Sequence, residues 1–270
     1  MDVPAEISAA AEPVIPLLPA YCEALKSLYE ACLVAQVTLR DPVTRIVYAG
    51  TILNPAPREF AFQHEYLTGS DDPEAVLAVI RADLPEPEAE HVLNVFAPDS
   101  AAVRALYEAR GYQYAWTMPL MYRPLQEADG HPTYAHPEFL VRPMASMADL
   151  EEADMLEDLS PTPRRMLEDP RFQGYVVERG DRIVAKGWLV LTPLGIGHIC
   201  QIYTEPGSRR QGCAEVLMQA LHLEACRQKM RGIVILPSKL VRQHKIGEKY
   251  GYREQLPITV MIPEIPDASD

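Results

Sequence analysis

The sequence predicts an α/β fold formed by two similar units that follow one another along the chain. Short apolar runs, typical of buried strands, alternate with stretches in which apolar residues recur every three or four positions, as they do on one face of a helix. The order of these segments in the first half recurs in the second half. One stretch of the second half, residues 199–225, reads as a strand, a basic loop with small residues, and a helix. Together these observations favour two tandem mixed-sheet domains.

The first unit is expected to span residues 1–130. Its helices are predicted at residues 20–33, 73–84 and 100–110, and its strands at residues 34–40, 45–53, 59–67, 92–97 and 113–122. Asp99 or Ser100 is a suitable N-cap for the third helix, and Gly111 is a suitable end. Residues 1–19 are expected to be irregular, because several prolines interrupt them.

The second unit is expected to span residues 131–270, after a linker at residues 126–135 that is rich in polar residues, glycine and proline. Its helices are predicted at residues 146–159 and 214–230, with a short one ending near residue 250, and its strands at residues 139–143, 174–178, 183–191, 199–204, 232–236 and 253–262. An Arg-Gly-Asp turn joins the second and third of these strands into a hairpin.

Short sequence matches indicate that the second unit is a copy of the first. Residues 95–98 read Val-Phe-Ala-Pro, and residues 234–237 read Val-Ile-Leu-Pro. Each match is followed at a similar distance by a Gly-Tyr pair, at Gly111 and at Gly251. Matches in this order predict an internal duplication, in which each unit ends in a strand, a helix and a strand.

The loop before the predicted helix at residues 214–230 has the composition of an anion-binding site. The start of a helix presents unpaired N–H groups and the positive end of the dipole. Arg209 and Arg210 add charged donors, and Gly212 lets a phosphate approach the backbone. One alternative is an ordinary strand-to-helix turn with solvated basic residues. Another is a site for a different nucleotide, which is disfavoured because no Walker lysine follows Gly212.

The composition excludes several classes of protein. The chain has 270 residues, a formal net charge of −13 and a pI of about 5.0. Its basic residues form only short clusters, so we expect no nucleic-acid partner. An acidic protein attracts cations, and amine-bearing substrates therefore fit better than phosphorylated ones.

The cysteines and the apolar runs bear on location and cofactors. The five cysteines are odd in number and show no C-x-x-C spacing, so neither a disulfide framework nor a metal site is indicated. No apolar run approaches the roughly 18 residues of a membrane span. The N-terminus lacks the basic segment of a signal peptide. We therefore expect a cytoplasmic protein that binds neither a metal nor a membrane; its oligomeric state is not indicated.

Three segments of the second half carry a family resemblance. Residues 141–150 hold Val-Arg-Pro-Met and then Asp-Leu, residues 209–214 read Arg-Arg-Gln-Gly-Cys-Ala, and residues 248–252 read Glu-Lys-Tyr-Gly-Tyr. They resemble, in this order, the first strand and helix, the acyl-CoA loop and the end of the late helix of the GCN5-related N-acetyltransferases (GNATs). The resemblance covers about residues 138–262.

This resemblance implies the GNAT acyl-CoA N-acyltransferase fold, acetyl-CoA as cosubstrate, and direct transfer of the acetyl group to a primary amine of a small molecule or peptide. The loop would hold the CoA pyrophosphate, and the strand before it would pair with the pantetheine arm at a bulge. A backbone N–H of residues 202–204 would polarise the thioester carbonyl. The residues implied in cofactor binding are Ile202, Tyr203, Thr204, Arg209, Arg210, Gln211, Gly212, Cys213, Ala214 and Glu215.

Two departures from the family pattern affect the catalytic residues. Many members carry a tyrosine, the acid for the leaving thiolate, where this sequence has Gly247. His244, one turn earlier, is a candidate replacement, and its alternative role is that of a surface histidine. His198, near where some members carry a catalytic glutamate, is the candidate base, and its alternative role is structural.

The first unit resembles the same fold without its cofactor loop. Residues 106–112 keep the late-helix signature, with Tyr107 where the second unit has Gly247. Residues 67–74, in place of the loop, carry three carboxylates that would repel a pyrophosphate. We expect this degenerate unit to bind no cofactor and to wall the substrate cleft of the other, with Tyr107 as a packing residue.

The sequence leaves two interpretations of the acceptor region and two of the activity. The acidic run at residues 149–158 lies in the region that borders the acceptor in this family, so it either attracts a polyamine, aminoglycoside or lysine-rich tail or forms a solvated helix face. The leading function is N-acetyltransferase. The alternative, motivated by Gly247 and the missing base, is a non-catalytic acyl-CoA-binding regulatory module.

Overall fold

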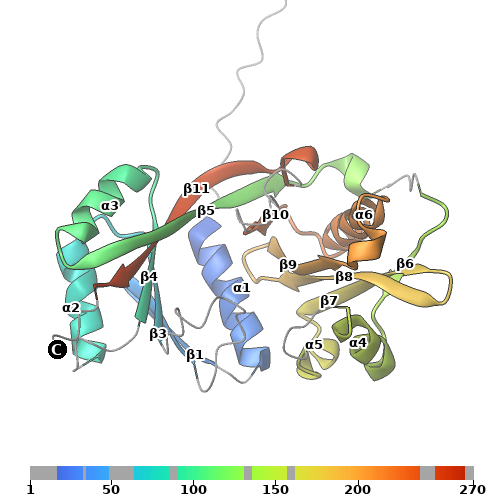
Figure 1. Ribbon diagram of the computed structural model, residues 1–270, viewed down its shortest axis with the longest axis horizontal. Coiled ribbons are helices and arrows are strands. Elements are labelled where there is room, and N and C mark those ends of the chain that lie inside the picture. Colours follow the sequence, from blue (N-terminus) through green and yellow to red (C-terminus); the bar gives the residue numbers. More distant parts are fainter. Residues whose placement is uncertain are drawn as a thin grey trace, which may run out of the picture.

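The computed structural model describes residues 17–32, 35–48, 64–84, 91–130, 136–156, 162–237 and 247–264. Every strand in these ranges belongs to one eleven-stranded sheet that runs through both halves of the chain (Figure 1). The predicted α/β fold is confirmed, but the two halves share one sheet.

The first half forms its elements close to the predicted places. They are α1 (Leu17–Cys32), β1 (Ala35–Arg40), β2 (Val43–Tyr48), β3 (His64–Thr68), α2 (Pro73–Asp83), β4 (His91–Phe96), α3 (Ser100–Glu108), β5 (Tyr112–Pro124) and the 3₁₀ turn η2 (Glu127–Gly130). The expectation of an irregular chain up to residue 19 is wrong for residues 17–19. Pro19 lies in the first turn of α1, where a backbone N–H has no helical partner to lose. Residues 1–16 lie outside the described ranges.

The second half also follows the predicted order. Its elements are β6 (Leu140–Pro143), α4 (Met147–Asp154), α5 (Arg165–Glu168), β7 (Phe172–Arg179), β8 (Arg182–Leu191), β9 (Ile196–Thr204), the 3₁₀ turn η3 (Pro206–Ser208), α6 (Cys213–Arg227), β10 (Gly232–Ile235) and β11 (Arg253–Pro263). Helix α4 is shorter than predicted and ends at Asp154.

The last strand of each half is exchanged. The strand order is β1-β2-β3-β4-β11-β5-β10-β9-β8-β7-β6. Strand β11, from the end of the second half, therefore pairs with β4 of the first half, and β5 of the first half pairs with β10 of the second. The two exchanged strands also pair with each other, from Arg253 opposite Tyr122 to Pro263 opposite Tyr112. Each half thus contributes a strand to the other.

The equivalent elements of the two halves have equivalent geometry, as the repeat predicts. The pairs β3–β4 and β9–β10 are parallel, while β4–β11 and β10–β5 are antiparallel. Gly111 and Gly251 precede the exchanged strands at φ of 80° and 79°, a left-handed conformation that glycine adopts without strain.

Helices cover both faces of the second half. On one face, α6 packs its apolar side on β8 residues such as Leu189. On the other, Trp188 packs in a cluster that contains Leu150 of α4, Met166 of α5 and Ala24 of α1. Alternate residues of β8 therefore face opposite layers, as expected for a central strand.

Helix α1 connects the two halves. The ring of Tyr21 lies 5.9 Å from that of Phe96 in β4 and 5.4 Å from that of His198 in β9, measured between ring centroids. Arg171 also donates a hydrogen bond to Ser27 over 3.2 Å. Figure 1 shows α1 in the middle of the molecule. As expected, the first half packs directly on the second.

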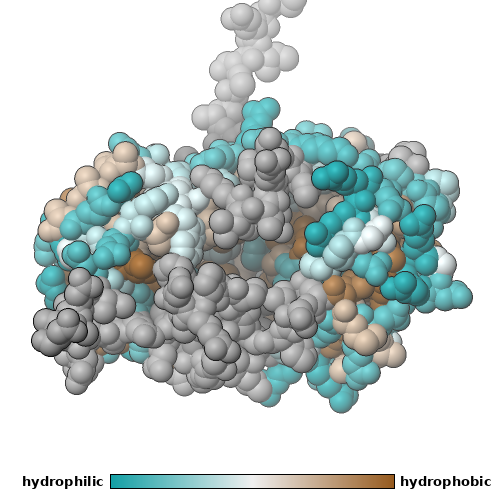
Figure 2. All heavy atoms as spheres, in the orientation of Figure 1, coloured by the Kyte–Doolittle hydropathy of each residue, from teal (hydrophilic) through white to brown (hydrophobic). Residues whose placement is uncertain are grey.

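The surface is mostly hydrophilic where Figure 2 colours it, with small hydrophobic areas. In the described part of the chain, the large apolar side chains that are exposed are Leu39, Leu106, Tyr114, Leu140 and Met155. Among the described helices, none combines the length and the apolar character needed to cross a membrane.

Candidate functional site

Strands β9 and β10 diverge next to the predicted loop. Their parallel pairing runs from Ile196 opposite Gly232 to Ile199 opposite Ile235. Beyond this point β9 continues to Thr204 without a β10 partner in the described part of the chain. Its backbone groups on that side are therefore available to an extended ligand, which could pair with them as an added strand.

A bulge marks the point of divergence. Opposite β8, Cys200 pairs with Trp188 and Tyr203 pairs with Lys186, so two residues of β9 lie opposite one residue of β8. Gln201, one of the two, has a φ of 50°. The extra residue bends β9 away from the regular sheet. The bulge that the family resemblance implies is thus present.

Helix α6 begins without a side-chain cap. Its N-cap residue is Gly212, at a φ of 97°, and no side chain caps the helix there. The N–H groups of Glu215 and Val216 donate to the Gly212 carbonyl. Within the described residues, the N–H groups of Cys213 and Ala214 make no hydrogen bond. This helix start can therefore receive an anion.

The loop side chains differ in how they are held. Arg209 donates to the Thr204 carbonyl over 3.0 Å, and its guanidinium lies 5.5 Å from the Tyr203 ring centroid. Gln211 donates to the Gly207 carbonyl over 2.8 Å. Arg210 is exposed at a φ of 63° and forms no ion pair with the described residues. Arg210 is thus the loop cation most available to a ligand.

Three of the implied cofactor residues are held by contacts within the protein. Cys213 is buried and its thiol donates to the Ser208 carbonyl over 3.3 Å; burial raises its pKa. Ile202 packs on the α6 core, and the Glu215 carboxylate lies 2.9 Å from the Lys249 ammonium. These side chains shape the site, so a ligand there would meet mainly backbone groups.

The sequence did not point to His136, whose ring packs on Gly212. A Cβ atom placed on Gly212 would lie 2.4 Å from His136 Nε2 and 2.5–2.6 Å from the neighbouring ring carbons. Real side chains cannot approach this closely. Glycine is therefore required here by the backbone conformation and by the histidine.

Gly247, which replaces the family's tyrosine, is buried against the exchanged strand. A Cβ there would lie 2.9 Å from Ile235 Cδ1 and 3.1 Å from Met121 Sδ of β5. No larger side chain fits without displacing them. Tyr252 is buried with its hydroxyl 2.8 Å from His222 Nε2, and burial raises the pKa of both Tyr250 and Tyr252.

Of the two candidate catalytic histidines, only His198 lies in the described part of the chain; His244 lies outside it. His198 is 4% exposed and packs edge-on against Tyr21. Its Nδ1 has no hydrogen-bond partner among the described residues. Burial lowers its pKa from 6.5 to about 4, so the ring is neutral at pH 7.

The corresponding place in the first half is closed. Strand β3 pairs with β4 over its whole length, so these strands do not diverge. Asp72 caps α2 by accepting hydrogen bonds from the N–H groups of Glu74 and Ala75 over 3.0 and 3.1 Å. A carboxylate of the protein thus takes the place an anionic ligand would need. Tyr107 is 1% exposed in the core, as expected for a packing residue, and burial raises its pKa to about 12.

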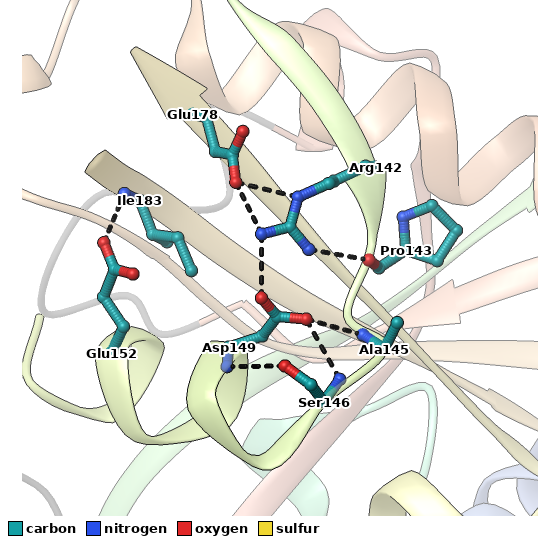
Figure 3. A network of polar contacts seen from close by, with 8 residues as sticks. All are labelled: Arg142, Pro143, Ala145, Ser146, Asp149, Glu152, Glu178 and Ile183. Carbon is teal, nitrogen blue, oxygen red and sulfur yellow. Dashed lines mark hydrogen bonds and ion pairs between the residues drawn. The ribbon is translucent and has the colours of Figure 1, made fainter. Parts of the chain in front are cut away.

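The acidic run of α4 mostly serves the protein itself (Figure 3). The Asp149 carboxylate forms an ion pair with Arg142 over 2.8 Å and accepts a hydrogen bond from the N–H of Ser146. The hydrogen-bonded Arg142 guanidinium holds the pKa of Asp149 well below the usual range of an aspartate. Glu152 accepts from the N–H of Ile183. Asp149 and Glu152 are therefore used within the protein, while Glu151 is exposed and residues 157–158 of the run lie outside the described ranges.

The carboxylate at the end of α4 also bonds to other groups of the protein. Asp154 lies 3.0 Å from the ammonium of buried Lys186 and accepts two hydrogen bonds from Thr162, both over 2.6 Å. Within the described residues, no cluster of histidine, cysteine and carboxylate side chains is arranged to hold a metal.

Comparison with known proteins agrees with this geometry. Residues 170–254 match the family model of the acetyltransferase (GNAT) domain, a range that includes the bulge, the loop and α6. A search of curated proteins found no match.

Solved structures resemble nearly the whole chain. A GCN5-related N-acetyltransferase from Kribbella flavida is 14% identical, with 92% of this chain and 97% of that chain covered and a TM-score of 0.65. One from Sphaerobacter thermophilus is 16% identical, with 93% and 95% covered and a TM-score of 0.57. At these identities the likeness shows the fold. The comparisons therefore show a match to the GNAT domain at residues 170–254, in the second half of the chain, and the fold of the GCN5-related N-acetyltransferases over nearly the whole chain.

Proposed function

We propose that this protein transfers an acetyl group from acetyl-CoA to a primary amine of a small molecule or peptide. The observation that carries this proposal is the uncapped start of α6 at Gly212, next to the divergence of β9 from β10. The first half offers a contrast within one chain, because Asp72 caps the equivalent helix and the equivalent strands stay paired.

In this proposal the backbone supplies most of the binding. The N–H groups of Cys213 and Ala214, with Arg210 beside them, hold the pyrophosphate. The free edge of β9 pairs with the pantetheine arm. The arm then directs the thioester toward residues 200–204, where a backbone N–H polarises its carbonyl.

The acceptor amine attacks the thioester carbon directly in its neutral form. A C–N bond forms and the C–S bond breaks, so the products are an amide and the CoA thiolate. We assign the proton released by the amine to His198, whose Nδ1 lacks a partner in the described structure, with a water molecule as relay because the ring is buried. At Gly247 the protein offers no acid, so the thiolate takes its proton from solvent.

The alternative function is a non-catalytic acyl-CoA-binding module. The packing of Met121 and Ile235 against Gly247, and the burial of His198, favour it. Both functions need CoA to bind, but only the first needs turnover.

A charge placed at the start of α6 tests the binding that both functions share. Ala214→Asp should weaken acetyl-CoA binding about tenfold or more, because a carboxylate would repel the pyrophosphate. The helix should stay folded, because Asp is favourable in a first turn. Ala214→Asn, of the same size but neutral, is the matched control. Calorimetry gives the affinities; equal affinities for the two variants would refute the site.

A second measurement separates the two functions. The wild-type protein with acetyl-CoA and a panel of primary amines should release free CoA thiol, detected with a thiol reagent. Tight binding of acetyl-CoA without thiol release on any amine would favour the non-catalytic module.

A further inference from the structure

Gln201 is the extra residue of the bulge in β9. Together with Ile202 it lies opposite a single residue of β8, Gly187. Its φ of 50° is in the left-handed region, which residues with a side chain rarely adopt. Strand β3 holds the equivalent place in the first half; all its residues are described, and none has a positive φ. The bulge is thus where the second half departs from the regular geometry of the first.

The described part of the chain has three non-glycine residues with a positive φ, namely Gln201, Arg210 and Lys229. Lys229 follows α6, and its N–H donates to the Cys226 carbonyl over 2.9 Å, so it forms the left-handed turn that often ends a helix. Gln201 and Arg210 lie in the bulge and the loop of the proposed site. Strained residues of this kind gather at functional sites, where the surrounding structure holds them. Gln201 is therefore a candidate for a role in the site.

The side chain of Gln201 lies in the gap that β10 leaves. The first four residues of β9, Ile196–Ile199, are buried, and these are the residues that pair with β10. Of the nine residues of β9, all of them described, Gln201 is the one that is exposed. Helix α6 covers one face of this part of the sheet, and α1, α4 and α5 cover the other. The Gln201 side chain therefore reaches solvent where the pairing with β10 has ended.

The neighbours of Gln201 leave its amide available. Ile202 packs under α6, because a Cβ built on Gly187 would lie 3.5 Å from Ile202 Cγ1 and 3.2 Å from Leu217 Cδ2. The Gln201 amide forms no hydrogen bond with another described residue. Both its oxygen and its nitrogen can therefore bond to a ligand at the point that the thioester reaches in the proposed function.

The ionisable groups beside the bulge are neutral or paired. Lys186 of β8 is buried, and its ammonium lies 3.0 Å from the Asp154 carboxylate. His198 of β9 is neutral at pH 7, because burial lowers its pKa to about 4. From α6, the apolar side chains of Leu217 and Leu221 face this part of β8. None of these groups presents an unpaired charge to an amine at the bulge.

We propose that Gln201 binds the acceptor amine, whose N–H donates a hydrogen bond to Oε1 of the amide. This inference rests on the proposed acetyl transfer and adds the residue that orients the attacking nitrogen. An amide suits this task because the amine attacks in its neutral form. A carboxylate would favour the ammonium ion, whose nitrogen has no lone pair for attack. The amide takes up no proton, so the proton still passes to His198.

Two substitutions at this position separate the side chain from the backbone. Gln201→Gly removes the amide and keeps the bulge, because glycine adopts a φ of 50° without strain. Gln201→Glu keeps the size of the side chain and adds a negative charge. Gln113→Glu adds the same charge at an exposed position of β5 in the first half and is the matched control.

The assay measures the release of CoA thiol from acetyl-CoA. The acceptors are butylamine, phenethylamine, spermidine and a peptide with a free N-terminus and one lysine, and the fastest of them is used for all variants. The measurements give kcat, KM for the amine and KM for acetyl-CoA over a range of pH.

Gln201→Gly should lower kcat/KM for the amine about three- to tenfold, as expected for the loss of one hydrogen bond, with KM for acetyl-CoA unchanged. Gln201→Glu should lower KM for the amine and also lower kcat at about pH 7, because the carboxylate raises the pKa of the bound ammonium by about one unit. The pH at which kcat is half its maximum should rise by the same amount. Gln113→Glu should match the wild type in all three constants.

Wild-type constants for the amine in both Gln201 variants would overturn the role of Gln201 and leave the proposed function intact. An unchanged half-maximal pH in Gln201→Glu would do the same. So would a Gln201→Gly variant whose KM for acetyl-CoA rises as much as its kcat/KM for the amine falls, because the residue would then only shape the strand. A wild-type protein that acetylates none of the amines would instead overturn the proposed function, and this inference with it.

Discussion

Single glycines separate the proposed ligand site from ordinary loop structure in this protein. Gly212 combines a φ of 97° with a neighbouring imidazole, whereas a Cβ on Gly207 in the same loop would have no atom within 4 Å. The sequence singles out Gly212 by its place before the helix, but it does not show the contact that makes glycine necessary there. The difference lies in His136, which is far from the loop in sequence and near it in the fold.

Replacement of these glycines should have unequal effects. Gly212→Ala should lower the free energy of unfolding by about 1–2 kcal/mol, the cost of a left-handed conformation for a residue with a side chain. It should also weaken acetyl-CoA binding, because His136 must move. Gly207→Ala should change neither. Urea unfolding and calorimetry measure the two effects, and similar losses in both variants would contradict this explanation.

Two buried histidines should make the protein sensitive to acid. Burial lowers the pKa of both His198 and His222 from 6.5 to about 4. In the unfolded chain they take up protons as pH falls below 6.5, whereas in the folded chain they do so only near pH 4. The stability that each contributes is therefore complete above pH 6.5 and is lost between pH 6.5 and 4.

As pH falls, the free energy of unfolding should decrease by at most about 1.4 kcal/mol per pH unit for each histidine. Urea unfolding at several pH values measures it. His198→Phe should reduce the slope by its own share, and an unchanged slope would show that His198 does not titrate in this way.

His198→Gln addresses the proposed catalytic role of the same residue. Loss of a proton acceptor should lower kcat by roughly a hundredfold, with KM for acetyl-CoA unchanged. An unchanged kcat would leave His198 with a packing role beside Tyr21.

At the scale of elements, the two halves differ at the start of one helix: Asp72 caps α2, whereas no side chain caps α6. The sequence predicted the helices and most strands near their observed places, because apolar periodicity and caps such as Asp99 are local signals. It also predicted the loop at residues 209–214. The carboxylates of the first-half loop were expected only to repel; the structure shows that one of them, Asp72, caps α2.

Removal of this cap should lower the free energy of unfolding and leave acyl-CoA binding unchanged. Asp72→Ala leaves two N–H groups of α2 without their acceptor, which should cost about 1 kcal/mol of unfolding free energy. It should not create a second acyl-CoA site, because β3 and β4 remain paired. Urea unfolding and the stoichiometry of acetyl-CoA binding check both points; a second bound equivalent would disprove the second.

At the scale of the molecule, the exchange of β5 and β11 makes the halves parts of one structure. The sequence repeat predicted two equivalent units but could not show which strand pairs with which. Both exchanged strands carry buried apolar residues, so by composition each strand could lie beside β4 or beside β10. The pairing depends on long-range contacts, such as those of Ile258 with Phe96 and with Met118, that no local pattern encodes.

The proposed boundary between residues 130 and 131 can be tested with fragments. Residues 131–270 alone would lack β5, so β10 and Gly247 would lose their neighbour Met121. We expect this fragment to be unfolded by circular dichroism. Co-expressed with residues 1–130, it should assemble into a complex that binds acetyl-CoA. A fragment that folds and binds CoA alone would show that the exchange is dispensable.

The exchanged strands also have a consequence for evolution. A half that binds no ligand can normally be deleted without harm. Here deletion of the first half would remove the strand that lies against β10 and Gly247 of the second. Any function of the second half would therefore keep the first half under selection, whereas the start of α2, which Asp72 caps, would be under no selection to hold a ligand.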